Sequence, residues 1–208
     1  MNYQELVDTS IAYADRHDVE VADNIDTFII LTEARVNRLL KTREQSARAY
    51  APTIDDEEFY SLPPDYAGMR DFQLNSDSPL VEHNVTNYEM MSPEQMNVQG
   101  RKSYHGTLYY CILANQIQIF PKQAAGQTIE MTYYQKVPSL NAGATINWLS
   151  ESHPDIYVAG MTAEIELFAK NYDAADGWFG RMKIAVSELD SADVKERWAG
   201  NTLITRVG

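Results

Sequence analysis

The sequence lacks the residues that most often hold metals or form disulfides. Its 208 residues include a single cysteine, Cys111, so an intrachain disulfide is excluded. This cysteine lies in the apolar run 108–113, where a thiol behaves as a small hydrophobic side chain. The histidines are scattered and belong to no H-E-x-x-H or C-x-x-C pattern; they are His17, His83, His105 and His153. We therefore expect no metal site and no cofactor.

Long apolar runs are also missing. The longest, residues 28–31 and 109–113, fall far short of the roughly 20 residues that a membrane-spanning helix needs. The N-terminus has no basic region followed by an apolar run, which is the pattern of a secretory signal. We therefore expect no membrane contact, synthesis in a cytoplasm, and a chain that begins directly in its folded part.

Positive charge is scarce. The chain has 17 lysines and arginines against 30 aspartates and glutamates, and its formal net charge is −13. Binding to phosphates draws its affinity from clustered cations, so this balance argues against a protein whose main task is to grip nucleic acid. Two interpretations stay open, namely a surface that resists sticking to DNA and the ordinary solubility of an acidic protein.

Catalytic motifs are absent as well. There is no G-x-S-x-G elbow, phosphate loop or dinucleotide fingerprint. The glycines that such motifs would need are isolated in expected turns, at Gly68, Gly100, Gly106, Gly126 and Gly143. We therefore predict no catalytic residues and expect that the protein is not an enzyme.

Three short patterns allow both a functional and a structural interpretation. The acidic run Asp55 to Glu58 lacks the interleaved Asn or Gly of a calcium loop and is typical of an exposed loop. The run Ser152 to Asp155 holds three catalytic residue types, but sequence neighbours rarely converge into a triad. Helix capping is therefore favoured, with Ser152 as the cap and with Pro154 and Asp155 in the first turn of the helix. The tyrosine pairs 109–110 and 133–134 lack the basic neighbours of a base-stacking platform, which favours core and subunit packing.

Helical periodicity is present at both ends of the chain. Residues 2–16 predict a short helix, and from Asp23 apolar residues recur at three- and four-residue steps up to Leu40, with Asp23 or Asn24 as the N-cap. After Asn147 the period is helical again up to Asn171. A last helix opens at Asp173 or Asp176, with an apolar stripe that continues to Val194 and Trp198 before Gly200.

The middle of the chain has the pattern of short strands separated by turn residues. Expected strands are 50–54, 59–62, 69–74 and 80–81. Residues 107–114 and 116–120 alternate around a turn at Asn115 and predict a hairpin, which the strand 128–137 extends into a three-stranded meander. Residues 92–96 predict a helical turn capped by Ser92 with Pro93 at its first position.

These segments predict an α+β fold, namely an antiparallel helical bundle formed by the N- and C-terminal segments with an inserted, mainly antiparallel β domain. The expected division is 1–48 for the N-terminal helices, 49–146 for the β domain, 147–199 for the C-terminal helices, and 200–208 for a docking tail. The last eight residues of this tail, 201–208, carry apolar side chains that so short a segment cannot bury against itself. It therefore needs another surface.

The order of several segments resembles one known family. The segments are Leu62-Pro63-Pro64-Asp65-Tyr66 with Met69-Arg70, then Met91-Ser92-Pro93-Glu94-Gln95, Ile112 to Pro121, Ile129 to Pro138, Asn147-Trp148-Leu149 through Asp155, and Arg197-Trp198-Ala199-Gly200. In this order and spacing they resemble the head-to-tail connector adaptors of tailed bacteriophages, the tail tubular protein A-like or phage adaptor family. The resemblance covers nearly the whole chain.

The resemblance implies a structural protein of the virion neck. Its members form a ring, commonly of twelve copies, around the DNA channel between the portal protein and the tail or nozzle protein, and DNA passes without tight binding. No catalytic, cofactor or metal residue carries over. Carried onto this chain, it assigns portal docking to the C-terminal segment, at Trp198, Leu203, Ile204, Arg206 and Val207, and tail contact to residues 52–138. The chain lacks a long C-terminal arm.

Two alternatives from other classes stay open. One is a tail-associated carbohydrate-binding or hydrolytic module that uses the β domain, which a pocket with Asp or Glu and aromatic side chains would favour. The other is a plain soluble binding protein, which would remain a monomer or dimer alone.

Overall fold

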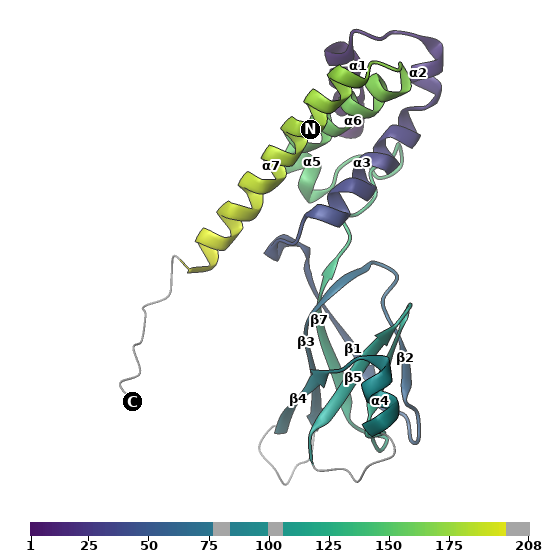
Figure 1. Ribbon diagram of the computed structural model, residues 1–208, viewed down its shortest axis with the longest axis vertical. Coiled ribbons are helices and arrows are strands. Elements are labelled where there is room, and N and C mark those ends of the chain that lie inside the picture. Colours follow the sequence, from purple (N-terminus) through teal and green to yellow (C-terminus); the bar gives the residue numbers. More distant parts are fainter. Residues whose placement is uncertain (77–83, 100–105, 199–208) are drawn as a thin grey trace. The chain divides into compact units, whose positions relative to one another are not determined.

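The chain folds into two compact units (Figure 1). The structure, a computed structural model, describes residues 1–76, 84–99 and 106–198. The helical unit consists of Met1–Glu44 and the chain from Val137 onward, and the β unit is Gln45–Lys136. The helical unit is therefore built from two segments that the β unit separates in sequence.

Within residues 1–44 and 137–198, the helical unit has six α-helices, of which four are long enough to bury a face. They are α1 (Tyr3–Ala14), α2 (Val19–Asp23), α3 (Ile25–Leu39), α5 (Trp148–Ser152), α6 (Pro154–Phe168) and α7 (Tyr172–Trp198). Asn2 and Glu5 form a capping box that starts α1, because each side chain accepts a hydrogen bond from the other's backbone N–H. Asn24 stands at the N-cap of α3, as expected, but its side chain donates to the Glu20 carbonyl oxygen instead. The short helix α2 had not been predicted.

Helix α6 lies at the centre of the helical unit. All eleven residues from Ile156 to Glu166 are buried, and α1, α3, α5 and α7 each pack against this helix. The buried apolar side chains of these helices make one hydrophobic core. Burial on every side, and not along one stripe, is typical of a helix enclosed by others.

The prediction of an antiparallel helical bundle was wrong. The sequence predicts one apolar stripe on this helix, through Tyr157, Met161, Ile165 and Phe168. Phe168 is 46% exposed, whereas the small residues Ala159, Gly160 and Ala163, which the stripe leaves out, are buried. These small residues let neighbouring helices approach α6 from the remaining sides. Segments from both ends of the chain contribute side chains to one core. Their helices pack around the central helix α6, and not as amphipathic helices that pair along single apolar stripes.

A buried polar network joins the two segments of the helical unit. The Glu33 carboxylate on α3 accepts hydrogen bonds from the Leu140 N–H at 2.7 Å and from the Tyr157 hydroxyl at 2.9 Å. The Asn147 amide nitrogen donates to the Tyr157 hydroxyl oxygen and to the Pro138 carbonyl oxygen. Burial raises the pKa of the Glu33 carboxyl, although these hydrogen bonds act in the opposite direction. Burial and the adjacent carboxylate raise the pKa of Tyr157, which keeps its hydroxyl a donor.

The β unit is a seven-stranded sheet in the order β1-β7-β3-β4-β5-β6-β2. The strands are β1 (Ser46–Pro52), β2 (Phe59–Ser61), β3 (Tyr66–Ser76), β4 (Asn84–Met90), β5 (Leu108–Leu113), β6 (Gln116–Phe120) and β7 (Thr128–Gln135). The predicted hairpin is confirmed, because β5 and β6 pair antiparallel. The predicted meander is wrong, because β7 pairs with β1 and β3 and not with β6.

The sheet is mixed, which corrects the expectation of an antiparallel β domain. Strands β4 and β5 run parallel, with Tyr88 opposite Leu108. Parallel neighbours need a crossover connection, and the helix α4 (Pro93–Gln99) lies in it. Ser92 caps α4 as predicted, since its hydroxyl accepts from the Gln95 N–H at 3.3 Å. The expected strand 80–81 lies outside the described residues.

The sheet curls around its own core. Phe72 on β3 packs against Tyr88 on β4 and against Tyr110 on β5, with ring centroids 4.7 Å and 5.1 Å apart. Strands β3 and β5 are not neighbours, so a flat sheet would hold these backbones about 10 Å apart with side chains standing side by side. Because the sheet curls, Phe72 and Tyr110 lie in the same apolar cluster, to which β3, β4, β5, β6 and β7 all contribute side chains.

At Gly160, α3 and α7 both lie close to α6: a Cβ there would overlap with the Thr32 methyl of α3 and lie 3.2 Å from the Met182 sulfur of α7. We expect Gly160→Ala to lower the free energy of unfolding by about 1–3 kcal/mol, because the crossing helices must separate. Gly177→Ala is the matched control, since a Cβ there meets nothing within 4 Å, and it should raise stability by up to about 1 kcal/mol. Urea unfolding of both variants tests this, and equal stabilities would contradict the central position of α6.

Candidate functional site

The run Ser152 to Asp155 forms a helix junction. Ser152 ends α5, His153 donates its backbone N–H to the Leu149 carbonyl oxygen at 2.8 Å, and Pro154 opens α6. Pro154 and Asp155 occupy the first turn as predicted. The expectation that Ser152 caps a helix was wrong, because Asn147 caps α5 and reciprocates with Ser150. Pro154 and Asp155 stand at positions that suit the start of a helix. The run does not form a catalytic triad.

The acidic run at Asp55 to Glu58 is an exposed loop with local contacts. Asp56 pairs with Lys122 at 3.0 Å, and this hydrogen bond raises the pKa of the lysine. A Glu57 carboxylate oxygen accepts from the backbone N–H groups of Glu58 and Phe59. Within the described part of the chain, no three His, Cys, Asp or Glu side chains gather closely enough to hold a metal ion.

Two of the four paired tyrosines are core residues. Tyr110 and Tyr133 are buried in the core of the β unit. The Tyr133 hydroxyl donates to Asp65 at 3.1 Å, and its ring stacks on Tyr66. The Arg70 guanidinium lies 5.2 Å from the centre of the Tyr134 ring. These rings pack within the unit.

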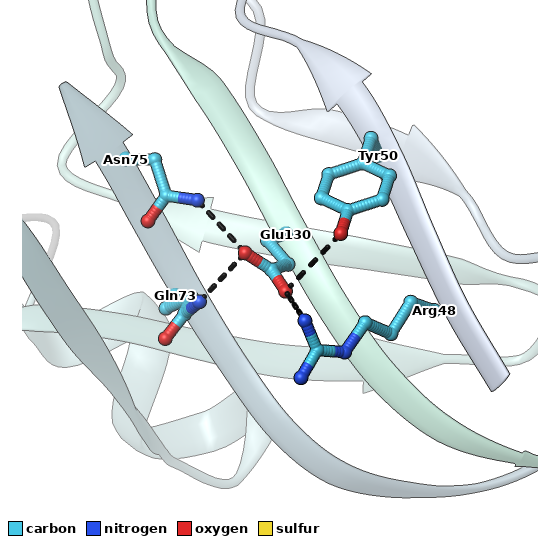
Figure 2. A network of polar contacts seen from close by, with 5 residues as sticks. All are labelled: Arg48, Tyr50, Gln73, Asn75 and Glu130. Carbon is cyan, nitrogen blue, oxygen red and sulfur yellow. Dashed lines mark hydrogen bonds and ion pairs between the residues drawn. The ribbon is translucent and has the colours of Figure 1, made fainter. Parts of the chain in front are cut away.

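A polar cluster of the β unit surrounds Glu130 on β7 (Figure 2). One carboxylate oxygen accepts from the Gln73 and Asn75 amides of β3, both at 2.8 Å. The other faces β1, where it pairs with Arg48 at 3.3 Å and accepts from the Tyr50 hydroxyl at 3.5 Å. The pairing register places Glu130 directly opposite both Tyr50 and Gln73.

The sequence analysis did not find this cluster. Its signal is a pair of polar residues two positions apart on each flanking strand, Arg48 with Tyr50 and Gln73 with Asn75, since residues at this spacing share a face. The two pairs meet around Glu130 only if β1 and β3 are the strands that lie beside β7. The incorrect assignment of β7 to a meander therefore hid the cluster.

Glu130 is suited to holding strands together and not to acid catalysis. Hydrogen bonds from Asn75 and Gln73 and the nearby Arg48 charge lower the pKa of this carboxyl, so it stays ionised. Most glycoside hydrolases need two carboxyl groups, one of them protonated, and the cluster contains one carboxylate whose contacts are all occupied by its own strands. The geometry therefore does not favour the hydrolytic alternative.

The predicted docking segment begins where α7 ends. Trp198 is the last residue of α7, and its side chain is not described; Leu203, Ile204, Arg206 and Val207 lie outside the described residues. The expected continuation of the apolar stripe to Val194 is wrong, because Val194 is 46% exposed. The buried position in that turn belongs to Asp193, which accepts from the Arg43 backbone N–H at 3.1 Å. The end of α7 is thus fixed to the segment that follows α3.

Two shallow grooves flank α7 within the helical unit. One, of about 400 Å³, lies between α1, α6 and α7, where Tyr13 stacks on Trp178 at 5.7 Å and Arg181 covers the Trp178 ring. The other, of about 130 Å³, lies between α3 and α7, where Arg35 covers the Phe179 ring at 4.0 Å. Both are open surfaces that combine aromatic side chains with arginines, a composition typical of protein–protein contacts.

Comparison with known proteins identifies one family. The family model described as SU10 adaptor protein matches residues 1–206. No curated protein matches the chain in sequence. No helix among the described residues has the length and apolar character to cross a membrane.

We expect Glu130→Gln to destabilise the protein by about 1–2 kcal/mol at neutral pH, because a neutral amide loses the ion pair and weakens charge-assisted hydrogen bonds. The pKa of Glu130 is lowered in the folded state, so its stabilisation is complete at neutral pH and is lost as pH falls through that lowered value. The stability difference from wild type should therefore narrow in acid. Thermal melting across pH measures it, with the exposed Glu89→Gln as control; identical melting of wild type and Glu130→Gln at pH 7 would refute the structural role.

Proposed function

The chain belongs to the SU10 adaptor protein family, and from this premise we propose that it is the structural head-to-tail adaptor of a tailed phage virion. In this proposal it forms a ring around the DNA channel, between the portal protein and the tail or nozzle protein, in the neck of the virion. The family match is the observation that carries the proposal, because it spans residues 1–206 of 208. Both compact units therefore fall within it.

The portal-docking element that we propose is the C-terminal segment with Trp198, Leu203, Ile204, Arg206 and Val207. The anchoring of α7 through Asp193 and Arg43 supports this assignment, because the segment then starts from a fixed point of the helical unit. Residues 52–138, which include most of the β unit, are the part that we propose meets the tail protein. The curled sheet of the β unit is held together by its own core and by the Glu130 cluster.

The charge of the chain supports a channel through which DNA slides. A net charge of −13 gives few lasting contacts with phosphates. The same charge makes copies repel one another in free solution. Contacts with a portal ring would offset that repulsion locally, so the ring is proposed to assemble on the portal.

The assembly step is tested by mixing the purified chain with rings of the portal protein from the same phage. We expect the chain alone to be largely monomeric in sedimentation at low salt and to form a closed ring when portal rings are present, as seen by electron microscopy. A stable ring formed by the chain alone would contradict assembly on the portal. A chain that stays monomeric with portal rings would contradict the adaptor function.

Deleting residues 201–208 should leave the chain folded and abolish or greatly weaken its attachment to portal rings. Each buried aliphatic side chain contributes about 1.5–3 kcal/mol, and ordering costs about 1–2 kcal/mol per residue, so one tail binds weakly. Many tails on one ring act together and make the joint strong.

The controls for this deletion are a melting curve and the triple variant Leu203→Ser, Ile204→Ser, Val207→Ser, which keeps the length of the chain. Normal melting with lost attachment of both variants is the expected result. Attachment as strong as that of the full chain would exclude the tail as the docking element, and failure to fold would assign the tail to the core of the chain itself.

A further inference from the structure

Helix α3 is apolar on two sides. Its inner side, with residues such as Phe28, Ile29 and Val36, is buried against α6. Its outer side carries two large apolar side chains that remain open to solvent, Leu31 at 43% and Leu39 at 50% exposed, about two turns apart along the helix. Neighbouring exposed apolar side chains mark a surface that a partner can cover. The outer side therefore lacks its cover in the single chain.

The C-terminal half of this outer side is basic in an otherwise acidic protein. Arg35, Arg38 and Lys183 line the groove between α3 and α7 together with Leu39. Arg35 is engaged by Glu164 at 2.7 Å. Arg38 and Lys183 are exposed, and among the described residues neither has an ion-pair partner. We call Leu31, Arg38, Leu39 and Lys183 the α3 face.

Helix α1 presents the opposite charge. Its two charged residues, Glu5 and Asp8, are both acidic and exposed, and Asp15 follows at its C-cap. Ala12 is exposed between Asp8 and Asp15 on the same side of the helix. We call Asp8, Ala12 and Asp15 the α1 face. One unit thus carries an apolar–basic face and a small apolar–acidic face on two different helices that both pack on α6.

We infer that the α1 face of one copy lies against the α3 face of the next copy in the ring. This inference rests on the proposed function, and it names the surface through which neighbouring copies meet. The charges favour a second copy of this chain as the partner that covers the α3 face. The acidic residues that can pair with Arg38 and Lys183 are present on the α1 face of the same chain. A contact between two different faces of identical subunits is heterologous, and such contacts close into rings when the rotation between copies fits.

The inference predicts a charge exchange. Arg38→Glu and Asp8→Arg each place like charges at every interface of the ring, so we expect each variant to assemble on portal rings at least about tenfold less efficiently than wild type. The double variant, with both changes in one chain, restores opposite charges at every interface and should assemble again. An equimolar mixture of the two single variants should also form rings of alternating copies, since an acidic and a basic side chain then face each other at every interface.

Matched controls separate this effect from net charge and folding. Lys170→Glu and Glu20→Arg change the charge by the same amounts at exposed positions outside both faces and should assemble as wild type does. Melting curves of all variants check folding. Rescue by the double variant itself excludes a folding defect as the cause of the losses.

The outcomes distinguish the inference from the proposed function. If wild type forms no ring on portals, the proposed function fails. If wild type and both single variants assemble equally, the α1–α3 contact is absent and this inference alone is overturned. If the single variants fail and neither the double variant nor the mixture assembles, the α3 face meets the portal or tail protein instead of a second copy, which also overturns it.

Discussion

The buried Glu33 carboxylate is the contact on which the helical unit depends. It lies on α3, before the β unit in sequence, and it accepts hydrogen bonds from Leu140 and Tyr157, which come after the β unit. A buried polar group in this position is costly unless it is hydrogen-bonded, so the returning chain is held at a defined place. Through Tyr157 the same network reaches α6, around which the other helices pack.

The central position of α6 accounts for the surfaces that a ring protein would need. Because α1, α3 and α7 all pack on α6, each of them turns an outer side to solvent. Two grooves lie beside α7 as a result, one next to α1 and one next to α3. The end of α7, fixed by Asp193 and Arg43, gives the C-terminal segment a defined origin. Docking and lateral contact are thus proposed on one unit, and tail contact on the other.

Local patterns in the sequence predicted elements better than their arrangement. The hairpin of β5 and β6, the cap at Ser92 and Pro154 at the start of α6 depend on neighbours in sequence, and all three are confirmed. Strand β7 lies between β1 and β3, which are distant from it in sequence. The alternation of apolar and polar residues within one strand does not show which other strands pair with it. The capped helix at Ser92 was itself the sign of a crossover, and thus of parallel strands, but the sequence predicted it only as a turn. The family was predicted from ordered motifs, and the match over residues 1–206 confirms it.

The account is tested most directly by electron cryo-microscopy of the neck of the intact virion, at a resolution that shows side chains. It predicts a closed ring of this chain between portal and tail, with the C-terminal segment on the portal and Asp8 of each copy beside Arg38 of its neighbour. A neck without this chain, or copies of it attached singly elsewhere on the particle, would contradict the account.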